Sequence, residues 1–318
     1  MSARILVTGA SGFIGRALVH SLVAAGHSVR ATTRQSGEVE LPGDVETVTT
    51  GDYRNPVDWA PLLAGVVSVV HLAGIAHIGP PFDEGEYDRV VHAATAELAA
   101  ACSKAGVRRF VFMSSVRAQS GAAAGRPLTE NDTPRPTEFY GCAKLRAEAA
   151  VRGTRIPWTI LRPTMVYGEG AKGNLAVLLR IADSPWPLPF AGLANQRSLV
   201  SLDNLIGAVL FVLGADVAAR QVYLVADPTA VTLPQIIAAL RRGLGRKPLL
   251  FPVPPGLLAY TLRLIGRGDV WERMGGSLVV DAGKLVDAGW NPDANTLGTL
   301  SHVAGQYCSG CGKRHTRC

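Results

Sequence analysis

Tyr140 and Lys144 are the residues of this chain whose types and spacing best fit acid–base chemistry. They are four positions apart, so in a helix they lie on one face and within reach of each other. A tyrosine hydroxyl has an ordinary pKa of about 10 and is a poor acid or base at neutral pH. A neighbouring ammonium and a positively charged ring favour the tyrosinate and bring that pKa towards the useful range. The pair therefore predicts a group that moves protons.

A glycine-rich turn near the start of the chain can hold a partner for that chemistry. Gly9, Gly12 and Gly15 occur at intervals of three, between an apolar strand and a helical pattern. Residues without side chains let a pyrophosphate approach the free N–H groups at a helix N-terminus. In this strand–turn–helix context the spacing predicts dinucleotide binding, and the Tyr/Lys pair then predicts a proton transfer that accompanies hydride transfer. The predicted contacts in this turn are Gly9, Ser11, Gly12, Phe13, Ile14 and Gly15.

The end of the second expected strand, residues 28–32, bears on which dinucleotide binds. Sites for NAD usually place an Asp or Glu there, which accepts a hydrogen bond from the ribose 2′-hydroxyl. This chain has no acid there; Arg34, helped by Arg30, can instead pair with a 2′-phosphate. NADP(H) is therefore the favoured cofactor, and NAD(H) is the alternative.

Three other strand ends carry candidate residues. Asp52 either accepts from the adenine amino group or caps its own turn. The segment Leu72-Ala73-Gly74 contains small residues that let the backbone lie close to the cofactor, and His71 before it is expected to be structural. Ser114 and Ser115 end the strand that precedes the Tyr140 helix, and one hydroxyl there can polarise a substrate carbonyl. Ser115 is the predicted catalytic residue, and Ser114 is expected to satisfy backbone groups.

The elements that must position these residues alternate between strands and helices. Expected strands cover residues 5–7, 28–32, 45–49, 66–72, 109–113 and 158–161, and expected helices cover 12–25, 86–105 and 138–151. This alternation predicts an α/β fold, a doubly wound parallel (Rossmann) sheet with ligands at the carboxyl ends of its strands. After Met165 the pattern changes, and we expect a smaller mixed α/β C-terminal substrate lobe.

The expected division has three parts. Residues 1–165 form the NAD(P)-binding domain, residues 166–303 form the substrate-binding lobe with about 198–226 returning to the sheet, and residues 304–318 form a disordered tail. The tail holds Cys308, Cys311 and Cys318 near His315, a spacing that also suits zinc. No core surrounds these residues, so we expect no metal.

Composition sets outer bounds on function. The chain has 318 residues, of which 47% are hydrophobic and 18% charged, and a formal net charge of +7. No run of Lys and Arg interleaves with aromatics, so nucleic acid is not an expected partner. No secretory signal and no apolar run of membrane length are seen; residues 254–265 are apolar, but this stretch is short and contains Arg263. A cytoplasmic enzyme without a membrane partner is the expectation.

Taken together, Thr8–Gly15, His71–Gly74, Ser114-Ser115 and Tyr140-x3-Lys144 resemble the extended short-chain dehydrogenase/reductases, the NAD-dependent epimerase/dehydratase family of nucleotide-sugar enzymes. The resemblance covers about residues 3–300. It implies a Ser115/Tyr140/Lys144 catalytic triad, a UDP-sugar substrate and, by analogy, a homodimer formed through residues 86–105 and 138–151. It also implies that Pro163 contacts the nicotinamide and that the substrate is contacted by Thr164, Asn174, Arg197 and Arg273.

Three chemistries compete within this family. A 4,6-dehydratase needs an Asp-Glu pair where this chain has Val116 and Arg117. A 4-epimerase that retains NAD normally has an acid at the end of the second strand, and this chain has none there. Segments 172–175, 197–205 and 276–281 resemble the UDP-2-acetamido-2,6-dideoxy-hexulose 4-reductases of bacterial surface-polysaccharide pathways. We therefore expect an NADPH-dependent 4-ketoreductase acting on a UDP-linked 4-keto-6-deoxy amino sugar. The alternatives are a UDP-sugar 4-epimerase (UDP-glucose/UDP-N-acetylglucosamine type) with tightly bound NAD and a non-catalytic NADP-binding regulatory protein.

Overall fold

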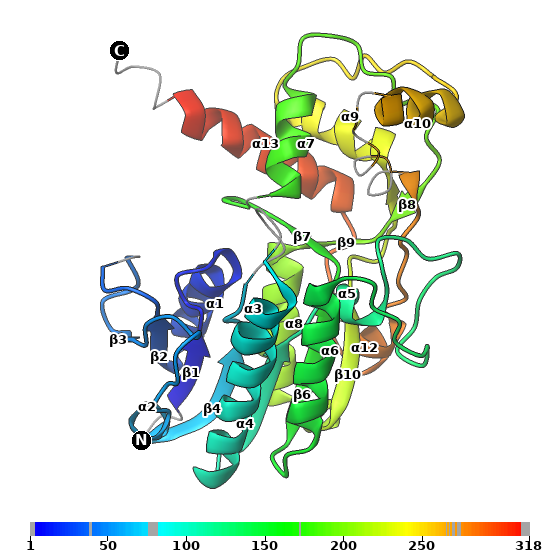
Figure 1. The fold of residues 1–318 in the computed structure, drawn as a ribbon. Helices are drawn as coiled ribbons and strands as arrows, with labels where there is room; N and C mark the ends of the chain where they lie inside the picture. Colours follow the sequence, from blue (N-terminus) through cyan, green and yellow to red (C-terminus); the bar gives the residue numbers. More distant parts are fainter. Residues whose placement is uncertain are drawn as a thin grey trace.

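The structure, a computed structural model, describes residues 4–37, 40–75, 82–171, 173–264 and 275–312, together with Gly266, Gly268 and Trp271 (Figure 1). A large sheet with helices on both faces forms one part of the molecule, and a mostly helical lobe lies beyond one end of its strands. None of the helices described within these ranges is both long and apolar enough to cross a bilayer.

Seven parallel strands form the central sheet, in the order β10-β6-β5-β4-β1-β2-β3. Their bounds are β1 Arg4–Thr8, β2 Ser28–Thr33, β3 Glu46–Thr49, β4 Val66–His71, β5 Arg109–Met113, β6 Trp158–Pro163 and β10 Gln221–Val225. Every residue of β5 is buried, as expected of a strand covered on both faces. The predicted doubly wound α/β fold is confirmed.

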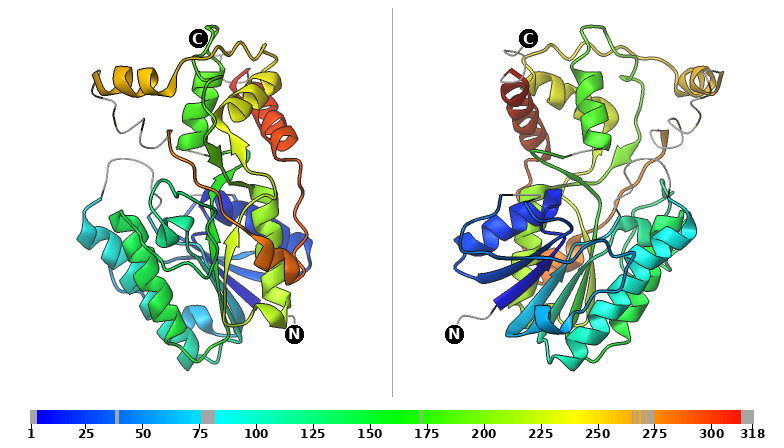
Figure 2. Two further views of the ribbon diagram at one scale, coloured as in Figure 1. Left: turned by 90° about the vertical axis from the view of Figure 1, so that its right-hand side faces the viewer. Right: turned by 60° about the vertical axis from the view of Figure 1, so that its left-hand side comes forward.

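Helices cover both faces of this sheet (Figure 2). On one face lie α1 Phe13–Ala24, α8 Leu202–Gly214 and α12 Gly283–Asp287, which share a core with Val7 and Val111. On the other face lie α2 Ala60–Leu63, α4 Ala94–Lys104 and α6 Phe139–Arg152, which share a core with Leu6 and Phe110. Because the strand side chains alternate between the two cores, each crossover helix buries one apolar stripe.

The helix expected at 86–105 is divided in the structure. It begins as α3 Glu84–Tyr87, continues through a π-helical segment at Asp88–Ala93 and ends as α4. Asp83 caps its start by accepting from the backbone N–H of Glu86 at 2.7 Å. The short α5 Val116–Gln119 follows β5 directly and leads through a long loop to α6.

The C-terminal lobe has its own apolar core, made by α7 Asn174–Ala182, α9 Leu233–Gly243 and α13 Thr296–Gly312. Two small strand pairs connect it to the sheet, a parallel pair of β7 Met165–Tyr167 with β9 Leu199–Ser201 and an antiparallel pair of β8 Gln196–Arg197 with β11 Val231–Thr232. A short 3-10 turn, Asp216–Ala218, follows α8, and α10 Pro255–Leu264 projects from the far side of the lobe (Figure 1).

A buried carboxylate joins the lobe to the sheet. Asp227 follows β10 and accepts hydrogen bonds from the Tyr167 hydroxyl at 2.7 Å, the Asn204 side-chain amide at 2.7 Å and the Ser201 backbone N–H at 3.0 Å. The Thr296 hydroxyl at the start of α13 also donates to it, at 3.2 Å. These donors come from four elements, so one side chain fixes where the lobe sits.

The prediction of a disordered tail over residues 304–318 is wrong for its first part, because α13 continues to Gly312. Leu300, Val303 and Ala304 lie on one helical face and are buried against α9 in the lobe core, which anchors the helix from which this segment continues. Cys318 and His315 of the candidate zinc set lie outside the described residues, as does Arg273.

Candidate functional site

The glycine turn between β1 and α1 has the geometry of an anion site. Gly9 has φ +70°, and a side chain at Gly15 would place its Cβ 2.2 Å from the Gly9 carbonyl oxygen. The turn can therefore close only with glycine at these places. Helix α1 begins at Phe13 without a side-chain cap and without an acid in its first turn. Its first N–H groups are thus suited to a negatively charged phosphate.

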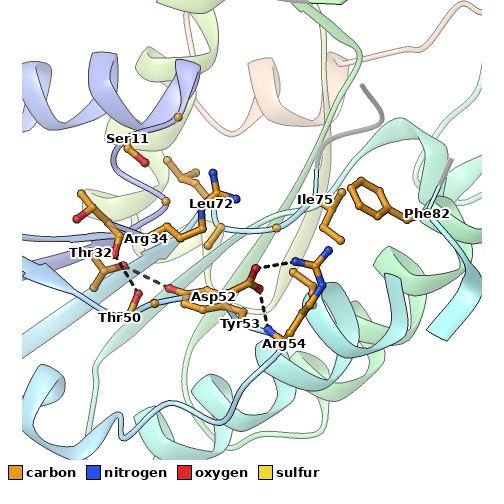
Figure 3. Close-up of a pocket in the computed structure, with 17 residues that line it drawn as sticks. Ser11, Thr32, Arg34, Thr50, Asp52, Tyr53, Arg54, Leu72, Ile75 and Phe82 are labelled. Carbon is orange, nitrogen blue, oxygen red and sulfur yellow. Dashed lines mark hydrogen bonds and ion pairs between the residues drawn. The ribbon is translucent and has the colours of Figure 1, made fainter. Parts of the chain in front are cut away.

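Next to this turn, a cavity of ≈ 380 Å³ opens at the carboxyl ends of β1, β2, β3 and β4 (Figure 3). It brings together eight of the predicted cofactor residues. They are Gly9, Ser11, Gly12, Arg34, Asp52, Leu72, Ala73 and Gly74. Phe13, Ile14 and Gly15 lie beside it in the first turn of α1, and Pro163 lies at the end of β6. A glycine cradle beside a cavity of this kind fits a dinucleotide.

Two arginines give this cavity a cationic lining. Arg34 follows β2 and points into the cavity, and Arg54 lies in the turn after β3 (Figure 3). Arg54 is held by Asp52 at 2.6 Å and by Glu86 at 2.7 Å. A hydrogen bond from the Arg54 backbone N–H, and the Arg54 charge, lower the pKa of Asp52 against the opposing effect of its partial burial. Asp52 thus lines the cavity as predicted and also closes its own turn.

Arg30 is a correction to the sequence interpretation. It does not line the cavity; its guanidinium donates to the carbonyl oxygens of Leu62 at 2.6 Å and Ala64 at 3.1 Å and lies 2.9 Å from Glu46. These carbonyls belong to the end of α2, whose last turn needs a donor. The second arginine that lines the cavity is Arg54, which the sequence interpretation missed. Its position two residues after Asp52 was a usable signal.

The catalytic candidates Ser115, Tyr140 and Lys144 meet where β5 ends against α6. Lys144 is only 5% exposed, and its ammonium donates to the carbonyl oxygen of Met113 at 2.7 Å and lies 6.0 Å from the centre of the Tyr140 ring. Burial lowers the pKa of Lys144 to about 8, while the charge of Glu148 opposes that change. The ammonium therefore lies in the range where it can lose its proton near neutral pH.

The buried position of Tyr140 dominates its pKa. Burial raises it to about 12, and a hydrogen bond with Ser115 and the charge of Arg117 only partly oppose this. At neutral pH the phenol therefore holds its proton, as a proton donor must, and the lower pKa expected beside a bound, positively charged nicotinamide stays a prediction.

Ser114 and Ser115 face different partners. The Ser114 hydroxyl donates to Glu148 at 2.6 Å, whereas the Ser115 hydroxyl accepts from the Arg117 backbone N–H at 3.1 Å and begins α5. Arg162 holds the same Glu148 through contacts at 2.8 and 2.6 Å and also contacts Gln119. Sequence reasoning missed Glu148 and Arg162, although Glu148 lies one turn after Lys144 on the same helix.

The predicted substrate residues do not form one group in the structure. Arg197 lies on β8, close enough to Arg117 for the two charges to interact; burial, and then the charge of Arg117, lower its pKa. Asn174 begins α7 and is exposed. Thr164 is buried, and both its N–H and its hydroxyl point to the Val225 carbonyl, at 3.0 and 3.4 Å, so its hydroxyl is not directed at a ligand. Arg117 is a further cation beside Tyr140, and its Nη1 has no hydrogen-bond partner within the described part of the chain.

Gly141 controls how closely Tyr140 approaches Ser115. A Cβ at this position would lie 2.3 Å from the Arg117 carbonyl oxygen and 3.0 Å from its carbon, so α6 packs directly on the backbone of α5. Only a residue without a side chain allows this approach, which carries the phenol of Tyr140 to the start of α5.

We predict that Gly141→Ala lowers the free energy of unfolding by about 1–3 kcal/mol, because backbone atoms cannot move aside as a side chain can. Gly153→Ala, at the end of the same helix, is the matched control: its new Cβ would meet its nearest neighbour at 3.4 Å. We expect it to stay within about 0.5 kcal/mol of the parent protein. Urea denaturation of the three proteins checks this, and equal stability of the two variants would contradict the close contact.

Comparison with known proteins places this site in a family. Residues 5–226 match the NAD dependent epimerase/dehydratase family. A UDP-glucose 4-epimerase of Vibrio cholerae is 33% identical over 306 residues, covering 92% of each chain. An N-acetyl-alpha-D-glucosaminyl-diphospho-ditrans,octacis-undecaprenol 4-epimerase of Escherichia coli O157:H7 is 30% identical, covering 84% of this chain and 78% of that protein.

Solved structures agree with the fold. MoeE5 in complex with UDP-glucuronic acid and NAD superposes with a TM-score of 0.77 at 25% identity, over 96% of this chain and 100% of the other. MoeE5 with UDP-glucose and NAD gives 0.75 at 26% identity, over 96% and 99%. With the glycine turn, the cavity and the Ser/Tyr/Lys cluster, these matches show that the chain belongs to the NAD dependent epimerase/dehydratase family and is an NAD(P)-dependent enzyme of the extended short-chain dehydrogenase/reductase type.

Proposed function

We propose that this enzyme is an NADPH-dependent 4-ketoreductase that acts on a UDP-linked 4-keto-6-deoxy amino sugar in bacterial polysaccharide biosynthesis. The observation that carries the proposal is the position of Arg34, which lines the cofactor cavity just after β2. Sites for NAD usually have an acid there, which accepts a hydrogen bond from the ribose 2′-hydroxyl. Among the described residues of the lining the one carboxylate is Asp52, and it is held by Arg54. Because Arg54 is paired with Asp52 and Glu86, Arg34 is the arginine of the lining that favours a 2′-phosphate, and NADP(H) is the cofactor of reductive steps.

The protonation of the catalytic cluster suits reduction. NADPH, when bound, supplies the hydride that becomes the new C–H bond at C4. Tyr140 donates its hydroxyl proton to the C4 oxygen, so the ketone becomes an alcohol, and solvent later returns a proton to Tyr140. Ser115 donates a hydrogen bond to the same oxygen and polarises the carbonyl. Lys144 stabilises the transient tyrosinate through its positive charge.

Dehydration is disfavoured by the residues beside this cluster. The two positions after Ser115, where a dehydratase would need its acid and base, are Val116, which is buried in a small apolar cluster, and Arg117. Arg117 and Arg197 instead offer positive charge to the substrate side of the site, which suits a nucleotide diphosphate. We extend the substrate contacts to Asn174 and Arg273 by resemblance only, and the homodimer through α4 and α6 is likewise a proposal.

A UDP-sugar 4-epimerase with tightly bound NAD is the second candidate. The names of the Vibrio cholerae and Escherichia coli relatives favour it, since both are 4-epimerases. The two candidates share Ser115, Tyr140 and Lys144 and differ in whether the cofactor is consumed. A single assay therefore separates them.

We predict that the enzyme oxidises NADPH when given a UDP-4-keto-6-deoxy-N-acetylhexosamine, seen as loss of nicotinamide absorbance. Tyr140→Phe should reduce turnover by roughly 10²–10⁴-fold, because the proton donor is lost, and should leave NADPH binding nearly intact. Tyr87→Phe, whose ring packs 5.9 Å from that of Tyr140, is the matched control and should retain turnover. Interconversion of UDP-N-acetylglucosamine and UDP-N-acetylgalactosamine without net NADPH oxidation would replace the reductase by the epimerase.

A second prediction concerns cofactor choice. Arg34→Glu should raise the Kd for NADPH by about 10- to 100-fold, because a charged hydrogen bond to the 2′-phosphate is replaced by repulsion. The Kd for NADH should fall or stay unchanged. Arg108→Glu makes the same change in charge just before β5, at the opposite end of the strands, and should alter neither value. Fluorescence titration with both nucleotides measures this, and a parent enzyme that prefers NADH would refute the assignment.

The third prediction follows from the pKa of Lys144. Below its pKa of about 8 the ammonium is present, and above it the charge is lost, so kcat/KM for reduction should fall as pH rises through about 8. Glu148→Gln removes the charge that raises this pKa, and the fall should then begin at lower pH. Steady-state rates across this range test both statements. A profile that is flat through pH 8 would exclude Lys144 as the titrating group.

A further inference from the structure

Helix α10 presents an apolar stripe to the outside of the C-terminal lobe. Leu257, Tyr260 and Leu264 follow one another at three- and four-residue spacing, so they lie on one face, and they are 54%, 60% and 67% exposed. Leu258, on the other side of the helix, packs into the apolar cluster with Leu193 and Ile237. The helix is therefore anchored by one apolar face and exposes a second one.

Neighbouring loops extend this apolar surface. Trp186 is 74% exposed, and Leu249 and Phe251 are also exposed. They belong to the same side of the lobe, because Leu188 exchanges backbone hydrogen bonds with Leu249 and Phe251 and packs in the cluster that seats α10. We call Trp186, Leu249, Phe251, Leu257, Tyr260 and Leu264 the α10 surface. Large exposed apolar groups gathered on one lobe are unusual for a protein surface that only meets water.

Positive charge predominates around the α10 surface. Residues 228–264 contain five Arg or Lys and no Asp or Glu, whereas the four charged residues that follow, Arg267, Asp269, Glu272 and Arg273, are balanced in sign. Of the five, Arg241 is turned inward and donates to backbone carbonyls, and Arg246 is paired with Asp183 at 2.7 Å. Arg242, Lys247 and Arg263 are exposed. Arg263 lies within α10 itself, between Tyr260 and Leu264, and Lys247 lies two residues before Leu249.

This combination points to one kind of partner. A Trp, a Tyr and leucines bordered by Arg and Lys suit the interface of an anionic bilayer, where the apolar groups enter the headgroup region and the cations meet lipid phosphates. A second copy of this chain suits it less, because residues 228–264 offer no Asp or Glu that could pair with the exposed cations across a two-fold contact. We propose that the α10 surface docks the enzyme peripherally on an anionic membrane, which revises the expectation of no membrane partner.

Docking through this surface would leave the chemistry accessible. Figure 1 shows α10 on the outer side of the lobe, while the cofactor cavity opens at the carboxyl ends of β1 to β4. The lobe that docks is also the lobe that carries Arg197. Substrate would thus be captured beside the lipid surface, whichever reaction follows, so this inference does not depend on the proposed reaction.

The test is co-sedimentation of the full chain with phosphatidylcholine vesicles and with phosphatidylcholine/phosphatidylglycerol vesicles at low salt. Binding to the anionic vesicles is expected, and the Leu257→Ser/Tyr260→Ser/Leu264→Ser variant should lose it by about tenfold or more. Lys247→Gln/Arg263→Gln should lose the preference for anionic lipid. Val217→Ser/Val286→Ser changes exposed apolar residues away from this surface and should bind as the parent does.

The fluorescence of Trp186 supplies a second measurement of membrane binding. Its variant changes neither a residue of α10 nor a core residue. Trp59, Trp158 and Trp290 are buried and Trp271 is half-buried, so a blue shift of fluorescence on adding anionic vesicles should come from Trp186 and vanish in Trp186→Phe. No binding of the parent to anionic vesicles, or equal binding to both vesicle types, would overturn the proposal. So would dimerisation that the triple variant abolishes, since the surface would then meet a second copy.

Discussion

A buried ion pair between Glu148 and Arg162 is the interaction on which the catalytic geometry depends. Their side chains are 1% and 2% exposed, so the pair persists only because each charge is compensated. Glu148 receives Ser114 from the end of β5 and Arg162 from β6, and it lies one turn beyond Lys144 on α6. One carboxylate therefore joins the two strands to the helix that carries the candidate catalytic residues Tyr140 and Lys144. The negative charge of Glu148 also raises the pKa of Lys144, which partly opposes the lowering by burial.

The lobe is attached by the same physical device with neutral donors. Asp227 is buried without a cation against it in the hydrogen bonds described, and four donors from β7, β9, α8 and α13 satisfy it. A carboxylate of this kind is costly to bury unless every donor is in place, so it selects one arrangement of lobe and sheet. The position of Arg197 relative to Tyr140 follows from that arrangement.

Local pattern was enough to predict the sheet, the glycine turn and the helix that carries Tyr140 and Lys144, because strand period, glycine spacing and i, i+4 pairing are properties of short segments. It was not enough for partners that meet only in three dimensions. Arg30 and Arg34 look alike in the sequence, yet the carbonyls at the end of α2 take Arg30 out of the cavity. Arg54, Glu148 and Arg162 gain their places through contacts between distant segments, and α13 is anchored against α9 through Leu300, Val303 and Ala304.

The two ends of the cofactor site are linked through charge. The protein groups around Tyr140 raise its pKa to about 12, and a neutral reduced nicotinamide adds no charge that would lower it, which suits proton donation to a ketone. A positively charged oxidised ring would lower the same pKa and favour the tyrosinate that an epimerase needs first to remove a substrate proton. Ser115, Tyr140 and Lys144 can therefore serve either direction, and the redox state of the bound nucleotide decides which. In the proposed reductase, Arg34 selects NADP(H) at the ribose end of the site, while the redox state of the nicotinamide governs the protonation of Tyr140 at the other end.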